Sequence, residues 1–127
     1  MHKTGLALCC ALVAAVFVAV PSAHSQAAGS PLAKRGEMLY KNRGCRACHG
    51  IGKKMIAPDL AGIEQRRSKE WIHRWLKETD VMLASDSTAI QMAAQYNNAH
   101  MPKQHLTDAD VDAILAYISS IEAMKGK

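Results

Sequence analysis

The chain has 127 residues, a length that corresponds to one small domain. It carries 16 Lys and Arg against 11 Asp and Glu, a formal net charge of +5, and no segment of it repeats. The basic residues do not form a run interleaved with aromatic side chains, so the composition argues against a nucleic-acid partner.

The first 25 residues have the plan of a secretory signal peptide. A short charged head precedes an apolar run over about residues 5–20, and Ala23 and Ser25 belong to a plausible cleavage triplet. The run is shorter than the roughly 20 residues of a spanning helix, which favours cleavage over retention as a membrane anchor. We therefore expect an exported protein with a flexible lead-in over residues 26–31 and one domain over residues 32–127.

Hydrophobic periodicity and capping residues predict an all-α domain with four main helices. The last helix is the clearest, because Thr107 and Asp110 form the Asp variant of a capping box ahead of apolar residues at helical spacing. Ser68 and Asp86 are candidate N-caps of two middle helices, the second of which is expected to bury Ile90, Met92 and Ala93. The expected ranges are about 32–42, 69–78, 87–96 and 108–125.

The most informative stretch is Cys45-Arg46-Ala47-Cys48-His49. Two thiols three residues apart project from one face of a helical turn and can form thioether bonds with the two vinyl groups of one haem. His49 follows at once and can bind the iron as its proximal ligand. A zinc site would need two further ligands at comparable spacing, and a dithiol redox motif would accompany a βαβ pattern. The pentapeptide therefore predicts one covalently bound haem c, with iron, in preference to a disulfide after export.

The residues between the motif and the second helix suggest how this histidine is held. A histidine bound to iron usually donates its other ring N–H to a carbonyl group, and Pro58 offers one in the loop that follows His49. Trp71 and Trp75 are four residues apart on the next predicted helix. Both are expected to contribute to the apolar core and the haem pocket, with the alternative that one indole N–H contacts a haem propionate.

A second iron ligand is predicted in the loop before the last helix. Met101 precedes Pro102, which disfavours helix at position 101, so its thioether can point inward from an extended loop. His100 and His105 are the rival ligands, because imidazole also binds iron well. Met82 is a weaker candidate, expected in a loop.

Taken together, these motifs resemble those of the small single-haem class I cytochromes c of the bacterial periplasm, over nearly all of residues 32–127. The resemblance implies three to five helices packed around one covalent haem, with the N- and C-terminal helices crossing. In that family a Gly/aromatic pair on the first helix packs across the last, which here implies contacts among Gly36, Tyr40 and Tyr117. The family often has Gly before the loop proline, whereas this chain has Ala57.

The expected function is that of a soluble periplasmic one-electron carrier, not an enzyme, because ligation by both His49 and Met101 leaves iron no open position. It would shuttle electrons between respiratory or oxidoreductase partners without stable insertion into the membrane. A haem-based sensor with a displaceable sixth ligand is the alternative, and a peroxidase is a more remote one. Five basic residues near the motif could attract acidic partners, or could simply be a solvated face. They are Lys41, Arg43, Arg46, Lys53 and Lys54.

Overall fold

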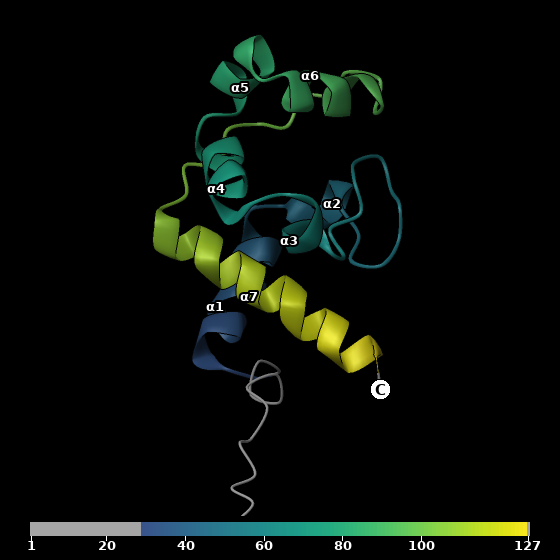
Figure 1. Cartoon of the computed structure of the whole chain (residues 1–127). Coiled ribbons are helices and arrows are strands. Elements are labelled where there is room, and N and C mark those ends of the chain that lie inside the picture. The colour runs from purple at the N-terminus through teal and green to yellow at the C-terminus, as the bar shows by residue number, and fades with distance from the viewer. Residues whose placement is uncertain (1–28, 127) are drawn as a thin grey trace, which may run out of the picture.

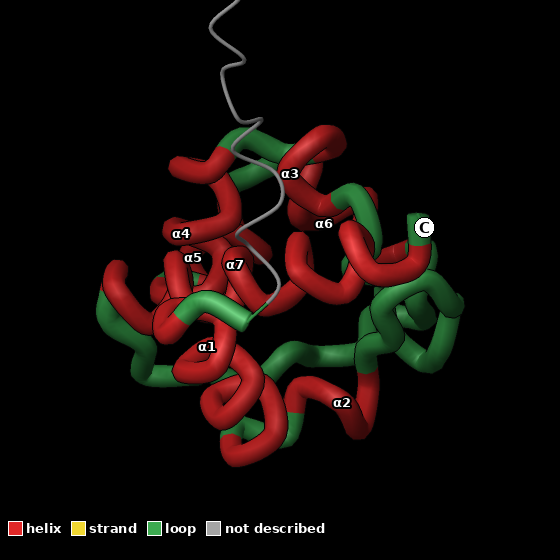
Figure 2. Tube along the Cα trace, turned by 90° about the horizontal axis from the view of Figure 1, so that it is seen from below, coloured by secondary structure: helices red, strands yellow, loops and turns green. Residues whose placement is uncertain are grey.

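The computed structural model describes residues 29–126, and all regular secondary structure in that range is helical (Figures 1 and 2). The predicted signal peptide and the first residues of the predicted lead-in lie outside the described residues. Within residues 29–126, no helix is both long enough and apolar enough to cross a membrane.

The first helix, α1 (Pro31–Asn42), begins one residue before the predicted start. Pro31 occupies its first turn, where the missing N–H of proline costs no helical hydrogen bond. The hydroxyl of Ser30 caps the helix by accepting a hydrogen bond from the Ala33 N–H at 3.1 Å. The buried face of α1 consists of Ala33, Gly36 and Tyr40.

The last helix, α7 (Asp108–Lys125), is the longest in the described part of the chain, with 18 residues. The predicted capping box is present: the Thr107 hydroxyl accepts from the Asp110 N–H, and the Asp110 carboxylate accepts from the Thr107 N–H. Val111, Ile114, Leu115 and Ile118 belong to the core cluster that this helix buries.

The crossing of α1 and α7 is the most extensive helix contact in the described structure, with α7 lying across α1 in Figure 1. A Cβ atom at Gly36 would lie 1.8 Å from the Ala113 carbonyl oxygen and 2.9 Å from the Tyr117 Cβ. Only glycine therefore permits this approach of the two backbones. The rings of Tyr40 and Tyr117 pack beside it with centroids 5.5 Å apart, which confirms the contact predicted among Gly36, Tyr40 and Tyr117.

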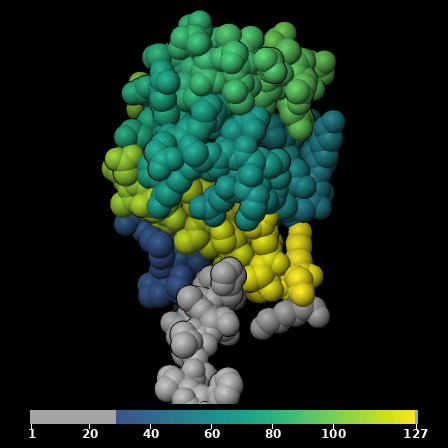
Figure 3. Space-filling model, viewed as in Figure 1, coloured from purple at the N-terminus to yellow at the C-terminus, as the bar shows by residue number. Residues whose placement is uncertain are grey.

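Five shorter helices connect these two. They are α2 (Cys45–Cys48), α3 (Ile63–Arg66), α4 (Lys69–Lys77), α5 (Thr79–Ser85) and α6 (Ser87–Ala94). Because α2 and α3 have four residues each, five of the seven helices within residues 29–126 are longer than a single turn, consistent with the expected three to five. In Figures 1 and 3, α5 and α6 form one end of the molecule, and α4 lies between them and α7.

The segment that includes α5 and α6 differs from the expectation in three ways. Met82, expected in a loop, is fully buried within α5. Ile90, expected to be buried, is 46% exposed, and Ala89 takes the buried position of α6 instead. α6 ends at Ala94, two residues before the predicted end. Because α6 is only eight residues long, its apolar residues do not identify the buried face, which its packing on α5 decides.

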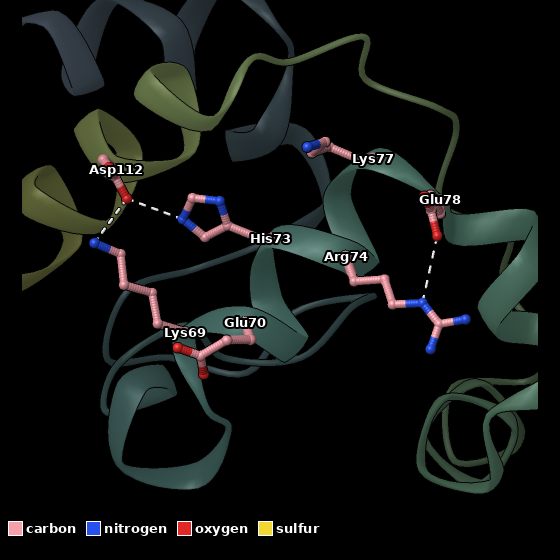
Figure 4. Close-up of a pocket in the computed structure, with 7 residues that line it drawn as sticks. All are labelled: Lys69, Glu70, His73, Arg74, Lys77, Glu78 and Asp112. Carbon is pink, nitrogen blue, oxygen red and sulfur yellow. Dashed lines mark hydrogen bonds and ion pairs between the residues drawn. The ribbon is translucent and has the colours of Figure 1, made fainter.

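Charged side chains join α4 to the N-terminal part of α7 (Figure 4). The His73 ring nitrogens lie 3.0 Å from an Asp108 oxygen and 2.9 Å from an Asp112 oxygen. Lys69 pairs with Asp112 and Lys77 with Asp108, each at 2.8 Å. Exposed pairs of this kind contribute little energy one by one. This group has no metal-binding arrangement of three His, Cys, Asp or Glu side chains, nor does any other part of residues 29–126.

We predict that Gly36→Ala destabilises the protein, although Ala is intrinsically the better helix former by about 1 kcal/mol. The added methyl would overlap the Ala113 carbonyl group, which is backbone of α7 and can move only if the helices separate. The expected loss is roughly 1–3 kcal/mol in the free energy of unfolding, measurable by thermal and denaturant unfolding of the holoprotein.

Gly126→Ala is the matched control. A Cβ at Gly126 would meet nothing closer than the Glu122 carbonyl oxygen at 3.7 Å, and its φ of −85° suits any residue. This change should stay within about 0.5 kcal/mol of the wild type. Equal stability of the two variants would contradict the role assigned to Gly36.

Asp110 should make the stability of the fold depend on acid pH. Hydrogen bonds from the Thr107 hydroxyl and N–H, with the Arg35 guanidinium at 2.6 Å, lower the pKa of Asp110 to about 2. An unfolded Asp has a pKa of about 3.9, so this stabilisation is complete above that value and disappears as pH falls toward 2. In denaturant titrations between pH 2 and 6, Asp110→Asn should be less stable at pH 6 and should lose less stability on acidification. If the free energy of unfolding changed equally with pH in the wild type and in Asp110→Asn, this role of Asp110 would be contradicted.

Candidate functional site

One cavity brings together the residues that the sequence predicts to bind the haem, its iron or the proximal histidine. Its volume is about 210 Å³, and its walls are mainly apolar. The walls come from α1, α2, α3, α4, α6 and α7 and from the loops after α2 and α6. All seven candidate residues line it: Cys45, Cys48, His49, Pro58, Trp71, Trp75 and Met101.

The two cysteines occupy a single helical turn, as predicted. Gly44 starts this turn with a left-handed φ of 73°, which a residue with a side chain would rarely adopt. Cys45 and Cys48 form the first and last positions of α2, and both are half-buried free thiols. Burial raises the pKa of the Cys45 thiol. The turn therefore presents both sulfur atoms to one cavity.

His49 follows the turn, and a hydrogen bond to its ring orients the side chain. Its Nδ1 lies 2.8 Å from the Pro58 carbonyl oxygen, so the predicted hydrogen bond is present despite Ala57 standing where the family often has Gly. A carbonyl can only accept, so Nδ1 carries the proton and Nε2 keeps its lone pair. An imidazole in this tautomer is ready to bind a metal ion through Nε2.

A second contact on His49 was not foreseen from the sequence. The Tyr40 hydroxyl donates to the His49 carbonyl oxygen at 2.8 Å. Burial, with further contributions from Cys45, Tyr117 and Asp59, raises the pKa of Tyr40 to about 12, so the hydroxyl keeps its proton at any physiological pH. The helix crossing and the histidine are thus linked through one side chain.

The loop after α6 forms another part of the cavity wall. Met101 is half-buried in this loop and lines the cavity. His100 also lines the cavity but is exposed. The Nε2 atom of His100, however, lies 2.9 Å from an Asp80 oxygen on α5. His105 is exposed, with a left-handed φ of 48°, and is not part of the cavity lining. Met101 and His100 therefore both line the cavity, and the His100 imidazole is already paired with Asp80.

The two tryptophans on α4 stack with centroids 5.6 Å apart and ring planes 9° apart. Both line the cavity, and Trp71 also packs against the core cluster. The Trp71 indole N–H donates a long hydrogen bond of 3.4 Å to Asp86. The pair therefore serves as core and as cavity wall together.

Arg67 packs against Trp71, a residue of the cavity wall. Its guanidinium lies 5.4 Å from the centre of the Trp71 ring, and its Nε is buried without a hydrogen-bond partner among residues 29–126. A buried, unsatisfied charged donor is costly unless an acceptor is supplied. Arg67 itself is not among the residues that line the cavity.

Comparisons with known proteins point to a single family. The family model for cytochrome c matches residues 33–122. Cytochrome c oxidase subunit 2 of Bacillus subtilis is 28% identical over an alignment of 115 residues, and the match covers 79% of this chain and 29% of that protein. Cytochrome c-554 of Methylosinus trichosporium is 42% identical over an alignment of 60 residues, and the match covers 45% of this chain and 42% of that protein. The chain thus spans less than half the length of either relative.

Solved structures share the fold. A cytochrome c from Rhodothermus marinus has a TM-score of 0.66 and 25% identity, covering 79% of this chain and 83% of that one. The cytochrome c domain of a Pseudomonas putida protein has a TM-score of 0.61 and 38% identity, covering 71% and 89%. Because the family model spans most of the described residues and includes the Cys-x-x-Cys-His motif, this chain belongs to the cytochrome c family, whose cofactor is covalently bound haem c with its iron.

Proposed function

We propose that the protein is a one-electron carrier whose haem iron is bound by His49 and Met101. The observation that carries the proposal is that one apolar cavity is lined by both free thiols, by a histidine whose Nε2 keeps its lone pair, and by Met101. Bound haem c would supply a one-electron Fe(III)/Fe(II) couple.

The residues of the cavity suit this cofactor in distinct ways. Cys45 and Cys48 would hold it through thioether bonds, and the Nε2 of His49 and the sulfur of Met101 would be the axial ligands. A thioether sulfur is a soft ligand that favours Fe(II), and apolar walls disfavour the extra charge of Fe(III). The reduction potential should therefore be well above that of a bis-histidine haem.

Ligation by two side chains would leave no open position for a substrate, so we propose a carrier and not an enzyme. We further propose export by the signal peptide of residues 1–25 and function in the periplasm. The likeness to cytochrome c oxidase subunit 2 supports a respiratory setting.

Basic residues on and near the cavity wall favour acidic redox partners. Arg43 lines the cavity, and Arg46 and Lys53 are exposed nearby in the chain. The Lys54 ammonium lies 5.4 Å from the centre of the Tyr96 ring, another residue of the cavity wall. The positive charge of these residues would attract a negatively charged docking surface and accelerate the encounter of the two proteins.

Met101→Ala should abolish the near-infrared sulfur-to-iron band of the oxidised protein, because the variant lacks the sulfur atom. The reduced variant should bind CO at the opened position, and its reduction potential should fall. Optical spectroscopy and a redox titration of the holoprotein measure all three.

Two controls accompany this substitution. Met124→Ala changes a methionine that is 56% exposed on α7 and should keep the band, as should His100→Ala. A band that survives Met101→Ala would refute the ligand assignment. Ready CO binding by the reduced wild-type protein at neutral pH would instead favour a sensor with a displaceable ligand.

Replacing Arg43, Arg46 and Lys53 together with Gln should slow electron transfer to an acidic partner by about tenfold at low ionic strength. The salt dependence of the rate should also become shallower, because fewer charges contribute to the attraction. Stopped-flow kinetics over a range of salt concentrations measure both effects.

The matched control changes Lys69, Arg74 and Lys77, three basic residues of α4 drawn in Figure 4, to Gln. The two triple variants have the same net charge. If the two variants slow the reaction equally, Arg43, Arg46 and Lys53 have no special role in attracting the partner.

A further inference from the structure

The loop that carries Pro58 is held by the side chain of the next residue. One carboxylate oxygen of Asp59 accepts hydrogen bonds from the Gly52 N–H at 2.7 Å and from the Ala61 N–H at 2.9 Å. Burial alone would raise the pKa of Asp59, but these N–H groups and the Arg66 charge outweigh it and lower the pKa. The carboxylate therefore fastens the two ends of residues 52–61 to each other while ionised.

Arg66 holds the same loop from α3. Its Nη2 donates to the Asp59 carbonyl oxygen at 2.6 Å, and its Nη1 donates to the Ala61 carbonyl oxygen. A guanidinium presents its N–H groups in a rigid planar fork, so two carbonyl groups bound to it have a defined separation. The peptide groups that follow Pro58 are thus held by Asp59 and Arg66 together.

The other side of Pro58 and the end of the loop are also fixed. The Ala57 N–H donates to the Cys48 carbonyl oxygen at 3.1 Å, next to His49 in the chain. From α7, Glu122 accepts from the Gly62 N–H, and Lys125 donates to the Ile51 carbonyl oxygen. Among these contacts, the side chains of Asp59 and Arg66 are the ones that bind the backbone of residues 59–61, directly after Pro58.

We infer that Asp59 and Arg66 are positioning residues that hold the Pro58 carbonyl at hydrogen-bond distance from the His49 Nδ1 and thereby tune the reduction potential. The inference rests on the proposed function only in taking His49 as an iron ligand. Neither residue touches the cavity: both act through the Pro58 carbonyl.

The chemical consequence has a definite sign. A strong acceptor at Nδ1–H draws the ring proton and makes Nε2 a better electron donor, and a more basic ligand stabilises Fe(III) over Fe(II). If the carbonyl is less well held, the hydrogen bond weakens on average and Fe(III) loses this stabilisation. Removal of either positioning residue should therefore raise the reduction potential.

This sign separates positioning from the direct effect of charge. Removing the negative charge of Asp59 would by simple electrostatics raise the potential, and removing the positive charge of Arg66 would lower it. Positioning predicts that both substitutions raise it. The test is a redox titration of the holoprotein for the wild type, Asp59→Ala and Arg66→Met.

For each variant we expect the reduction equilibrium to shift toward Fe(II) by roughly threefold to tenfold, where tenfold equals 59 mV for one electron. Asp59→Asn keeps one acceptor oxygen and loses the charge, so its shift should be clearly smaller than that of Asp59→Ala. Amide hydrogen exchange at Gly52 and Ala61 should accelerate in Asp59→Ala, which reports the loosened loop without reference to the iron.

Two results would overturn the inference. One is opposite shifts of potential in Asp59→Ala and Arg66→Met, which is the outcome of charge alone. The other is an unchanged potential in both variants while the near-infrared band of the wild type persists. Absence of that band from the wild-type protein would instead count against the proposed Met101 ligation, so the two failures are distinguishable.

Discussion

The close contact of α1 with α7 at Gly36 is the constraint on which the other features depend. It buries Tyr40 beside Tyr117, and the Tyr40 hydroxyl then holds the His49 carbonyl. The same helix α7 contacts the loop after the haem-binding motif through Glu122 and Lys125. The backbones of the two helices approach closely at Gly36, and Tyr40, one turn along α1, connects this crossing to His49.

The two proposed iron ligands are held in different ways. His49 has hydrogen bonds on its carbonyl and on its ring, and the loop that supplies the ring acceptor is itself fastened by Asp59 and Arg66. Met101 lies in a loop that follows two left-handed asparagines, Asn97 and Asn98, and the side chain of its neighbour His100 contacts Asp80 in an exposed pair. A rigid proximal side suits a carrier, because ligand geometry that is the same in both oxidation states requires little rearrangement during electron transfer.

Apolar side chains form the walls of the cavity, whereas charged side chains lie between the helices outside it. The stacked Trp71 and Trp75 and the core residues of α7 form the apolar walls, where a large cofactor would complete a core that a domain of this size can only partly build for itself. His73 of α4 contacts Asp112 of α7 (Figure 4) and also Asp108 at the start of that helix. Surface ion pairs of this kind contribute little to stability.

The sequence by itself determined the features whose physics is local: the two thiols and the histidine of one helical turn, the caps at Ser68, Asp86 and Thr107, and the spacing of Gly36 and Tyr40. The family resemblance added the Gly36 and Tyr117 contact, which the structure contains. Tertiary structure alone decided that Met82 is helical and buried, that Ile90 is exposed, and that Tyr40, Asp59 and Arg66 hold the residues around His49 and Pro58. These contacts arise from the paths of short helices and loops. The path of a loop depends on packing partners that are distant in the chain, so the periodicity of the residues does not predict it.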